Sequence, residues 1–373
     1  MEEVPDFRKN RGRRYNLHDL LVVSILAFLS GADDFEGIAS FAKHKKVFLS
    51  GEGLLGAERL PSHDLFRWVF MSLDKTSFAQ LLAAWLSCCI ERSQLDSSAQ
   101  ISDNTLRAIQ IDGKSLRASR SSVPHHAALQ VVSAFVGATH LTLDQVIIDD
   151  KSCEKNAIPQ LLQLLDLKDS VVTIDAIATY KKNAQIIVDK KGDYILALKK
   201  NNKMLFEEVQ SFFAHFHDTT LIHDSCQQVE QNHGRTESRI CKIISQLEYF
   251  PEVENWKNLQ SIVHIEAQRT SNGKTSLENR YYLSSLPPKA CQLQQLIRGH
   301  WAIENNLHWV LDVAFNEDKH RLRNKNAAFC CTTLRRFALA LIKNANISND
   351  SIKAQRLQIG WDNELLKQYF NIL

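Results

Sequence analysis

The sequence predicts a protein of the α+β or α/β class, in which a helical N-terminal region precedes a mixed sheet. Residues 16–95 repeat apolar side chains with the 3.6-residue period of helices. From residue 108 the pattern changes to short, alternating apolar runs separated by two helical stretches. Residues 201–290 alternate like strands again after one more helix. We therefore expect an N-terminal helical domain, a mixed sheet and a β-rich insertion.

Composition is that of a globular protein with more than one core. The chain has 373 residues, more than a single core normally holds, and 44% of them are apolar. The longest apolar run near the N-terminus, residues 20–32, is too short to span a bilayer and lacks a cleavage-site pattern. We expect a buried helix there, and a cytoplasmic protein without a membrane partner.

The eight cysteines do not have the spacing of a metal site or of a redox motif. No CxxC occurs, and two adjacent pairs, Cys88–Cys89 and Cys330–Cys331, lie in apolar, helix-like surroundings. Cysteines in such places are normally reduced core residues. A structural zinc site is not expected.

Strands and helices between residues 108 and 199 have the order β-β-β-α-β-α-β. The expected strands are 108–113, 128–137, 141–149, 171–175 and 193–199, and the expected helices are 158–167 and 181–191. By analogy this is the order of a ribonuclease-H-like mixed sheet. The first and fourth strands are neighbours in that fold.

Three acidic residues are candidate functional residues because of their positions in the predicted strands and helices. Asp112 and Asp175 each end a short apolar strand, and Glu304 belongs to a helical stretch rich in His and Trp. An Asp at a strand end is often an ordinary turn residue. Two of them, followed by a Glu on a helix, can instead hold two divalent metal ions that assist an in-line phosphoryl displacement. Carboxylate oxygens are the ligands that Mg²⁺ prefers.

The surroundings of Glu304 allow more than one site. His300, Glu304 and His308 are four residues apart, so a continuous helix places them on one face. A zinc site is one alternative, although the HExxH order is absent. Asp312 is an alternative third ligand for the metal pair. We favour a Mg²⁺-bound Glu304 flanked by positioning histidines, and expect Trp301 and Trp309 to pack inside the protein.

Basic residues are clustered although the net charge is only +3, from 45 Lys and Arg against 42 Asp and Glu. Basic clusters occupy residues 7–15, 43–46, 199–203 and 319–325. Each alone is typical of a solvated surface, but together they can neutralise phosphates around an acidic site. Basic and polar residues in these clusters, in the insertion or close to the acidic residues are the DNA-binding candidates: Arg11, Arg13, Arg14, Lys114, Arg235, Arg239, Arg298, His300, Asn305 and His308.

Several segments, in a fixed order, resemble one known family. They are PSHDLFRWVF, IQIDGKSLRAS, VVTIDA, KGDYILALKKN, HGRTESR, RYYLSSL and RGHWAIENNLHWVLDVAFNED. Together they resemble the H-repeat-associated family of bacterial insertion-sequence transposases, which are DDE-type enzymes with a ribonuclease-H-like core. The resemblance runs from about residue 7 to about residue 343. It implies that Asp112, Asp175 and Glu304 are the catalytic, metal-binding triad.

This resemblance also implies a function. It predicts a nucleoid-associated DNA transposase that uses two Mg²⁺ ions, which Mn²⁺ can replace. The enzyme would cut phosphodiesters at the inverted repeats of the element and join the 3′-OH to target DNA, as a homodimer in the synaptic complex. The alternative is a non-catalytic DNA-binding remnant of a decayed or domesticated transposase.

Domain boundaries are predicted from the same patterns. An N-terminal helical, DNA-binding or accessory domain covers residues 1–100, and the catalytic domain begins with residues 105–200. The β-rich insertion covers residues 201–290 and lies before the last catalytic helix. Residues 291–345 complete the catalytic domain with the Glu304 helix, and residues 346–373 form a C-terminal tail.

Overall fold

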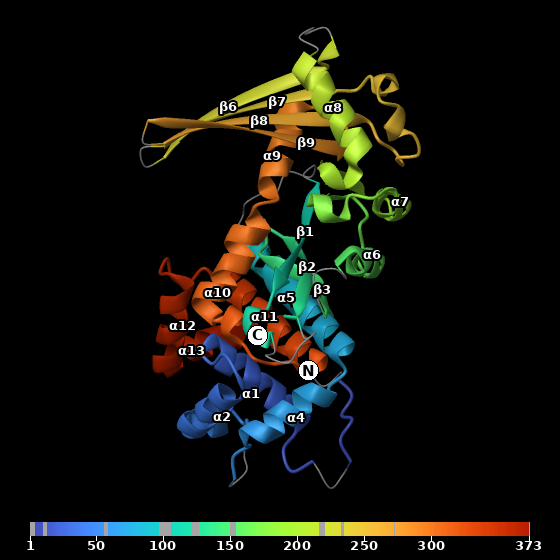
Figure 1. Ribbon diagram of the computed structural model, residues 1–373. Helices are drawn as coiled ribbons and strands as arrows, with labels where there is room; N and C mark the ends of the chain where they lie inside the picture. Colours follow the sequence, from blue (N-terminus) through green and yellow to red (C-terminus); the bar gives the residue numbers. More distant parts are fainter. Residues whose placement is uncertain are drawn as a thin grey trace. The chain divides into compact units, whose positions relative to one another are not determined.

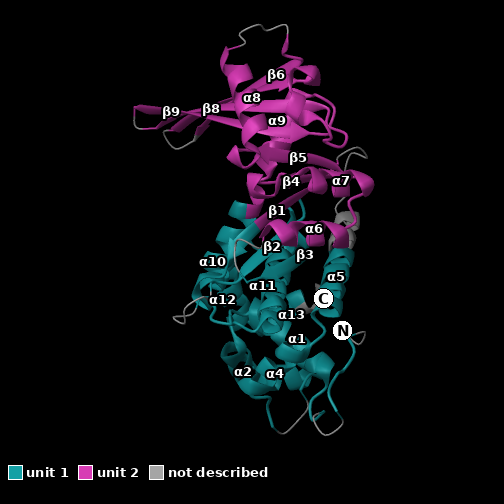
Figure 2. Cartoon of the chain, turned by 45° about the vertical axis from the view of Figure 1, so that its right-hand side comes forward, with its two compact units in different colours: residues 1–103, 113–153, 304–373 teal, residues 104–112, 154–303 magenta. Residues whose placement is uncertain are grey.

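The structure is a computed structural model with mixed helix and sheet content (Figure 1). It describes residues 4–9, 13–55, 59–96, 106–120, 127–149, 154–215, 221–232, 235–271 and 273–372. The chain forms two compact units (Figure 2). Unit 1 consists of residues 1–103, 113–153 and 304–373, and unit 2 of residues 104–112 and 154–303. Within the described ranges, no helix is long and apolar enough to cross a membrane.

The strands form a mixed sheet with the order β3-β2-β1-β4-β5-β9-β8-β7-β6. Its first five members have the ribonuclease-H-like arrangement that the sequence predicts. These strands are β1 (Arg107–Ser115), β2 (Gln130–Val136), β3 (Leu141–Ile148), β4 (Ser170–Ile174) and β5 (Asp193–Leu198). Strands β2 and β3 are antiparallel, whereas β1, β4 and β5 run parallel. The predicted adjacency of the first and fourth strands is confirmed.

Buried β-branched and aliphatic residues hold the parallel strands of unit 2 together. Ile109 and Ile111 on β1 and Val171 and Val172 on β4 have no exposed surface. Parallel strands that are covered on both faces read as such continuous apolar runs. The crossovers between them contain α6 (Glu154–Leu164) and α7 (Lys181–Asp189).

The β-rich insertion extends this sheet instead of forming a separate one. Its strands are β6 (Asp224–Asn232), β7 (Arg235–Ile244), β8 (Ser261–Ser271) and β9 (Lys274–Ser284), and β9 pairs antiparallel with β5. An unpaired β5 would present an open edge, and β9 covers it. Strand β6 lacks a clear sequence signal, because its residues, DSCQQVEQN, are mostly polar.

Two helices cover opposite faces of the β6–β9 meander (Figure 1). On one face, α9 (Ala290–Gly299) packs Leu293 and Ile297 against Val263 and other core residues. On the other face, α8 (Lys203–His215) places Phe213 against the His264 ring. Because side chains alternate along a strand, the neighbouring residues Val263 and His264 point to opposite faces and pack against different helices.

Unit 1 is built around a long buried helix, α11 (Lys325–Ala345). The helices α1, α4, α5, α10, α12 and α13 and the strand β3 pack against it. Their bounds are α1 (Leu17–Leu29), α4 (His63–Ser72), α5 (Lys75–Asp96), α10 (Trp309–Phe315), α12 (Ile352–Trp361) and α13 (Asn363–Ile372). Two shorter helices, α2 (Phe35–His44) and α3 (Lys46–Gly51), follow α1. Eleven of the thirteen α1 residues are buried, as the sequence predicts for this apolar run.

A buried arginine docks α12, within the predicted C-terminal tail, onto the end of α1. The Arg356 side chain donates hydrogen bonds to the backbone carbonyls of Phe28 (3.0 Å), Ala32 (2.9 Å) and Ala314. It also pairs with Asp33 at 3.0 Å. The last carbonyls of a helix have no partner within the helix, and a cation there satisfies them.

Replacing Arg356 with Met should destabilise unit 1. The change keeps an apolar stem but leaves several buried carbonyls without a donor, each at a cost of about 1–3 kcal/mol. We expect a clear fall in the thermal unfolding temperature, measured by circular dichroism. Lys353→Met on the exposed side of the same helix is the control and should change little. An equal effect of both substitutions would contradict the proposed docking role.

Candidate active site

Asp112 and Asp175 occupy equivalent places on neighbouring parallel strands. Ile111 of β1 and Ile174 of β4 are partners in the register, and each is followed directly by the aspartate. Neighbouring strands lie about 4.8 Å apart. Unit 2 thus has two carboxylates at adjacent strand positions on one edge of its parallel strands.

Asp175 is surrounded by groups that stabilise its negative charge. Burial acts to raise its pKa, but the Ala176 backbone N–H, the Lys199 ammonium and the charge of His300 together lower it below the usual value. The Lys199 Nζ lies 3.1 Å from Asp175 Oδ1. The imidazole of His300 is held by Thr173, with 2.8 Å between Oγ1 and Nδ1. Asp175 is therefore ionised at neutral pH.

Glu304 and His308 belong to a π-helical segment, Ile303–His308. The preceding helix α9 ends at Gly299, so the predicted continuous helix carrying His300, Glu304 and His308 on one face is wrong. Within the π-helical segment, His308 Nδ1 still lies 3.2 Å from Glu304 Oε2. π-Helical turns are rare in proteins overall, and those that occur are frequently found at functional sites.

The carboxyl group of Glu304 is exposed, and its surroundings favour the ionised form. Its hydrogen bond with His308 is the largest cause of a lowered pKa, and the charges of His308 and Lys114 act in the same direction against burial. The side chain of His308 is only 4% exposed, whereas that of Glu304 is 59% exposed. A buried imidazole therefore orients an accessible carboxylate.

Lys114 is buried in unit 1 and takes part in a network of charged side chains next to the Glu304–His308 pair. Its ammonium group pairs with Asp312 and with Glu317 Oε2 at 3.2 Å, and donates to the His308 carbonyl at 3.3 Å. Glu317 has no exposed side-chain surface and also binds Arg336 Nη1 at 2.8 Å. The predicted phosphate contact of Lys114 does not fit this burial, because its charge is committed inside the fold.

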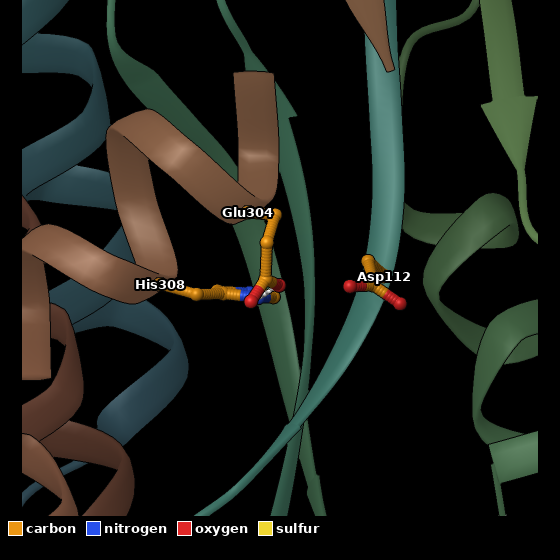
Figure 3. A group of neighbouring side chains, drawn as sticks. All are labelled: Asp112, Glu304 and His308. Atoms are coloured by element: carbon orange, nitrogen blue, oxygen red, sulfur yellow. Dashed lines mark hydrogen bonds and ion pairs between the residues drawn. The ribbon is translucent and has the colours of Figure 1, made fainter. Parts of the chain in front are cut away.

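Three side chains have the composition of a metal site. Glu304 and His308 of the π-helical segment in unit 1 offer a carboxylate and an imidazole, and Asp112 of β1 offers a second carboxylate; Figure 3 draws the three side chains. Two carboxylates and an imidazole suit a divalent cation. Asp175, whose carboxylate pairs with Lys199, is not in this group. Asp312, the alternative ligand, is committed to Lys114.

The arginines predicted to bind DNA in the insertion and on α9 are paired with glutamates. Arg298 contacts Glu230 with both terminal nitrogens, one of them at 2.6 Å. Arg239 lies 2.7 Å from Glu237, and Arg235 lies 2.5 Å from the same carboxylate. Each guanidinium thus already has an anionic partner.

The N-terminal arginines are accessible in part of the predicted segment. Arg13 and Arg14 are exposed, whereas Arg11 lies outside the described residues. Arg13 donates to the Arg8 carbonyl at 2.9 Å and lies 3.5 Å from an Asp6 oxygen. Arg14 extends the basic surface next to it.

The two tryptophans near Glu304 are on the surface, so the expectation that they pack inside the protein is wrong. Trp301 is 48% exposed and Trp309 is 61% exposed. The guanidinium of Arg280 lies over the Trp301 ring, 4.8 Å from its centroid. Asn305, a predicted DNA contact, is exposed as well. Tertiary packing, which a single helix pattern does not reveal, decides which face of such a segment is covered.

Sequence reasoning missed the partners of the predicted residues. The sequence places Lys199 only in a basic cluster, yet it follows β5, the neighbour of the strand that directly precedes Asp175. The predicted strand order contains that information. The pairing of Lys114 with Glu317 has no comparable sequence signal, because the two residues are distant in the chain and meet only in the fold.

Comparisons with known proteins show which family the chain resembles. The family described as Transposase DDE domain matches residues 103–341, and the family described as DDE_Tnp_1-associated matches residues 1–86. The chain is 33% identical over 360 residues to "Putative transposase YncI" of Escherichia coli O157:H7, covering 95% of this chain and 89% of that protein. It is 30% identical over 370 residues to "H repeat-associated putative transposase YhhI" of Escherichia coli K12, covering 97% of this chain and 94% of that protein.

One solved structure is similar over the whole chain. It is a cryo-EM structure of the piggyBac transposase synaptic complex with hairpin DNA, with a TM-score of 0.40 and 10% sequence identity. The match covers 100% of this chain and 74% of the other.

The Glu317 carboxylate should make the stability of unit 1 sensitive to acid. Burial acts to raise its pKa, but Arg336, Lys114 and Arg335 lower it from 4.5 to about 2. Because the pKa is depressed in the folded state, the stabilisation is complete above pH 4.5 and is lost as the pH falls towards 2. We expect Glu317→Gln to lower the melting temperature at neutral pH and to flatten its dependence on acid pH.

Thermal melting at several pH values would measure this effect. Glu364→Gln is a matched control, since the Glu364 side chain is 80% exposed and loses only a surface pair. If Glu317→Gln and wild type lost stability equally on acidification, the network would not stabilise the fold as inferred.

Proposed function

The chain belongs to the DDE transposase family, and from this premise we propose the reaction that it performs. It is a transposase of a bacterial insertion sequence that cuts phosphodiesters at the element ends and joins the freed 3′-OH to target DNA. The reaction is a phosphoryl transfer assisted by two divalent metal ions. The observation that supports this most strongly is the register of β1 and β4, which sets Asp112 and Asp175 side by side.

Asp112, Asp175 and Glu304 are the proposed metal ligands. Mg²⁺ fits these oxygen donors, and Mn²⁺ fits both the carboxylates and the nearby imidazole of His308. When bound, a metal pair supplies stabilisation of the negative charge on the attacking and leaving oxygens. The lowered pKa values of Asp175 and Glu304 support this assignment, since both groups are charged without a metal.

Neighbouring side chains prepare the carboxylates for this task. His308 orients Glu304 through their hydrogen bond, and buried Lys114 fixes the His308 backbone and adds positive charge. Lys199 pairs with Asp175. A cation held by Asp175 would take over that charge and would leave the Lys199 ammonium free to contact a DNA phosphate.

DNA is the proposed partner, both at the inverted repeats and at the target. Arg13 and Arg14 offer exposed charges, and the arginines of the insertion offer a second basic surface. Phosphate contacts position the protein without reading sequence. We propose a homodimer in the synaptic complex, because two element ends are joined in one reaction.

Replacing Asp112 or Asp175 with Asn should abolish cleavage while DNA binding persists. The amide keeps the volume of the side chain but removes the charge that a metal ion requires. Cleavage of a labelled element end in Mg²⁺ or Mn²⁺, together with a gel-shift measurement, would separate the two properties. Asp189→Asn on the exposed side of α7 is the control and should cleave like wild type.

Cleavage by either active-site variant would rule out the assigned role. A wild-type protein that binds element ends but never cleaves them would support a non-catalytic remnant instead.

Replacing Arg13 and Arg14 with Ala should weaken binding to all DNA sequences by a similar factor. Each lost phosphate contact should lower the log–log salt slope by roughly 0.9 on duplex DNA. Fluorescence anisotropy with a short labelled duplex at increasing salt would measure this, with Lys353→Ala as the control. Unchanged affinity and slope would show that these arginines form a solvated arm outside the DNA surface.

A further inference from the structure

One face of the β6–β7–β8 strands changes from an apolar core to a cluster of charges along its length. Near α9 this face carries the buried Cys226 and Cys241, which pack with Leu293. Residues two, four and six positions further along the same strands point to the same side. The charged residues there, with Arg298 from α9, are Glu230, Arg235, Glu237, Arg239, Arg269 and Arg298.

Two glutamates of this cluster face each other across the strands. Glu230 and Glu237 are direct partners in the antiparallel register of β6 and β7. Like charges in such a position repel and destabilise the pair. Arg239 lies between them, 3.3 Å from Glu230 and 2.7 Å from Glu237. Although burial acts to raise its pKa, Glu237 has a lowered pKa because of Arg235, Arg239 and Arg269.

Arg298 binds the outer glutamate in the way that it would bind a phosphate. Both of its terminal nitrogens contact Glu230, one with each carboxylate oxygen. A planar guanidinium presents the same paired donors to a carboxylate and to a phosphate group. The pair lies beside an open hollow lined also by Gln228 and Gln295, and the Arg298 side chain remains 46% exposed.

The charge of the cluster favours an anionic partner. Four arginines against two glutamates leave a formal charge of +2 (4 − 2). Both side chains of the Arg298–Glu230 pair are partly exposed, so solvent screens their attraction, and an external anion with the same paired acceptors can replace Glu230. The phosphates of a DNA backbone carry charge at high density and bind such surfaces with release of counterions.

We infer that Glu230 is a built-in competitor of DNA at this arginine cluster. Its carboxylate occupies the position on Arg298 that suits a phosphate, and a backbone phosphate of duplex DNA displaces it. This inference deepens the proposed function, because it rests on DNA being the partner. It gives the insertion a second role besides binding, which is to limit its affinity for arbitrary DNA.

The test is to compare Glu230→Gln with wild type in binding a short labelled duplex of mixed sequence. The amide cannot neutralise Arg298, so we expect tighter binding by several-fold and a log–log salt slope steeper by about 0.9. Glu207→Gln is the matched control: it removes the same charge from an exposed Lys203–Glu207 pair on α8 of the same unit. Glu230→Asp keeps the charge and should bind like wild type.

A double-substitution cycle identifies the partner through which Glu230 acts. In an Arg298→Ala background, Glu230→Gln should lose most of its effect on DNA affinity. If Glu230→Gln binds no more tightly than Glu207→Gln, or binds more weakly than wild type, the competitor role is overturned. Weaker binding would mean that Glu230 merely holds the arginines in place.

Failure of this inference is distinguishable from failure of the proposed function. Cleavage of element ends in Mg²⁺ tests the acidic site, whereas binding of the mixed-sequence duplex tests the arginine cluster without any cleavage. Wild-type cleavage with unchanged DNA affinity of Glu230→Gln would overturn only the competitor role. Tighter binding by Glu230→Gln supports that role whether or not the acidic site cleaves DNA.

Discussion

The parallel pairing of β1 with β4 is the constraint on which the candidate active site depends. Asp112 and Asp175 are distant in sequence, and only the register Ile111↔Ile174 brings them to equivalent strand positions. Side-chain direction reverses at every residue of a strand, so a shift of one residue would turn one carboxylate to the opposite face. Buried Ile and Val residues on both strands oppose such a shift. Apolar packing in the core thus determines the position of the charges at its edge.

The charged residues of the candidate active site have counter-charges within the fold. Lys199 pairs with Asp175, His308 binds Glu304, and Lys114 pairs with buried Glu317. Such pairing lowers the pKa values of the carboxylates and keeps them ionised. The partners differ in accessibility. Lys199 is 61% exposed and can leave, whereas Lys114 is 7% exposed and is held by several bonds. Exposed partners are suited to exchange with a ligand, and buried ones to positioning.

The sequence predicted those parts of the fold that follow from local patterns. Alternation and apolar runs identified β1 to β5 and the helices between them, and aspartates at strand ends indicated the candidate site. The same rules give no clear signal for β6, whose mostly polar residues lack an apolar face that could mark a strand. They also failed where tertiary contacts decide the outcome. The α9 helix ends at Gly299 and a π-helical segment follows, so His300 contacts Thr173 instead of continuing the face of Glu304. Lys114 can be buried because Asp312 and Glu317 neutralise its charge. Local periodicity does not predict that these distant residues meet in the fold.

The position of the insertion between β5 and the Glu304 segment has a structural consequence. Its last strand, β9, pairs with β5, and α9 then leads from the insertion to the π-helical segment. Lys199 directly follows Leu198, the last residue of β5 that pairs with β9. Arg280 directly precedes Tyr281, the β9 residue that pairs with Leu198. The residues around Asp175 are therefore supported by hydrogen bonds from the insertion itself. An insertion that only added a DNA-binding surface could be attached through loops. Because this one forms part of the sheet beside Asp175, removing it would expose the β5 edge and disturb the site that it adjoins.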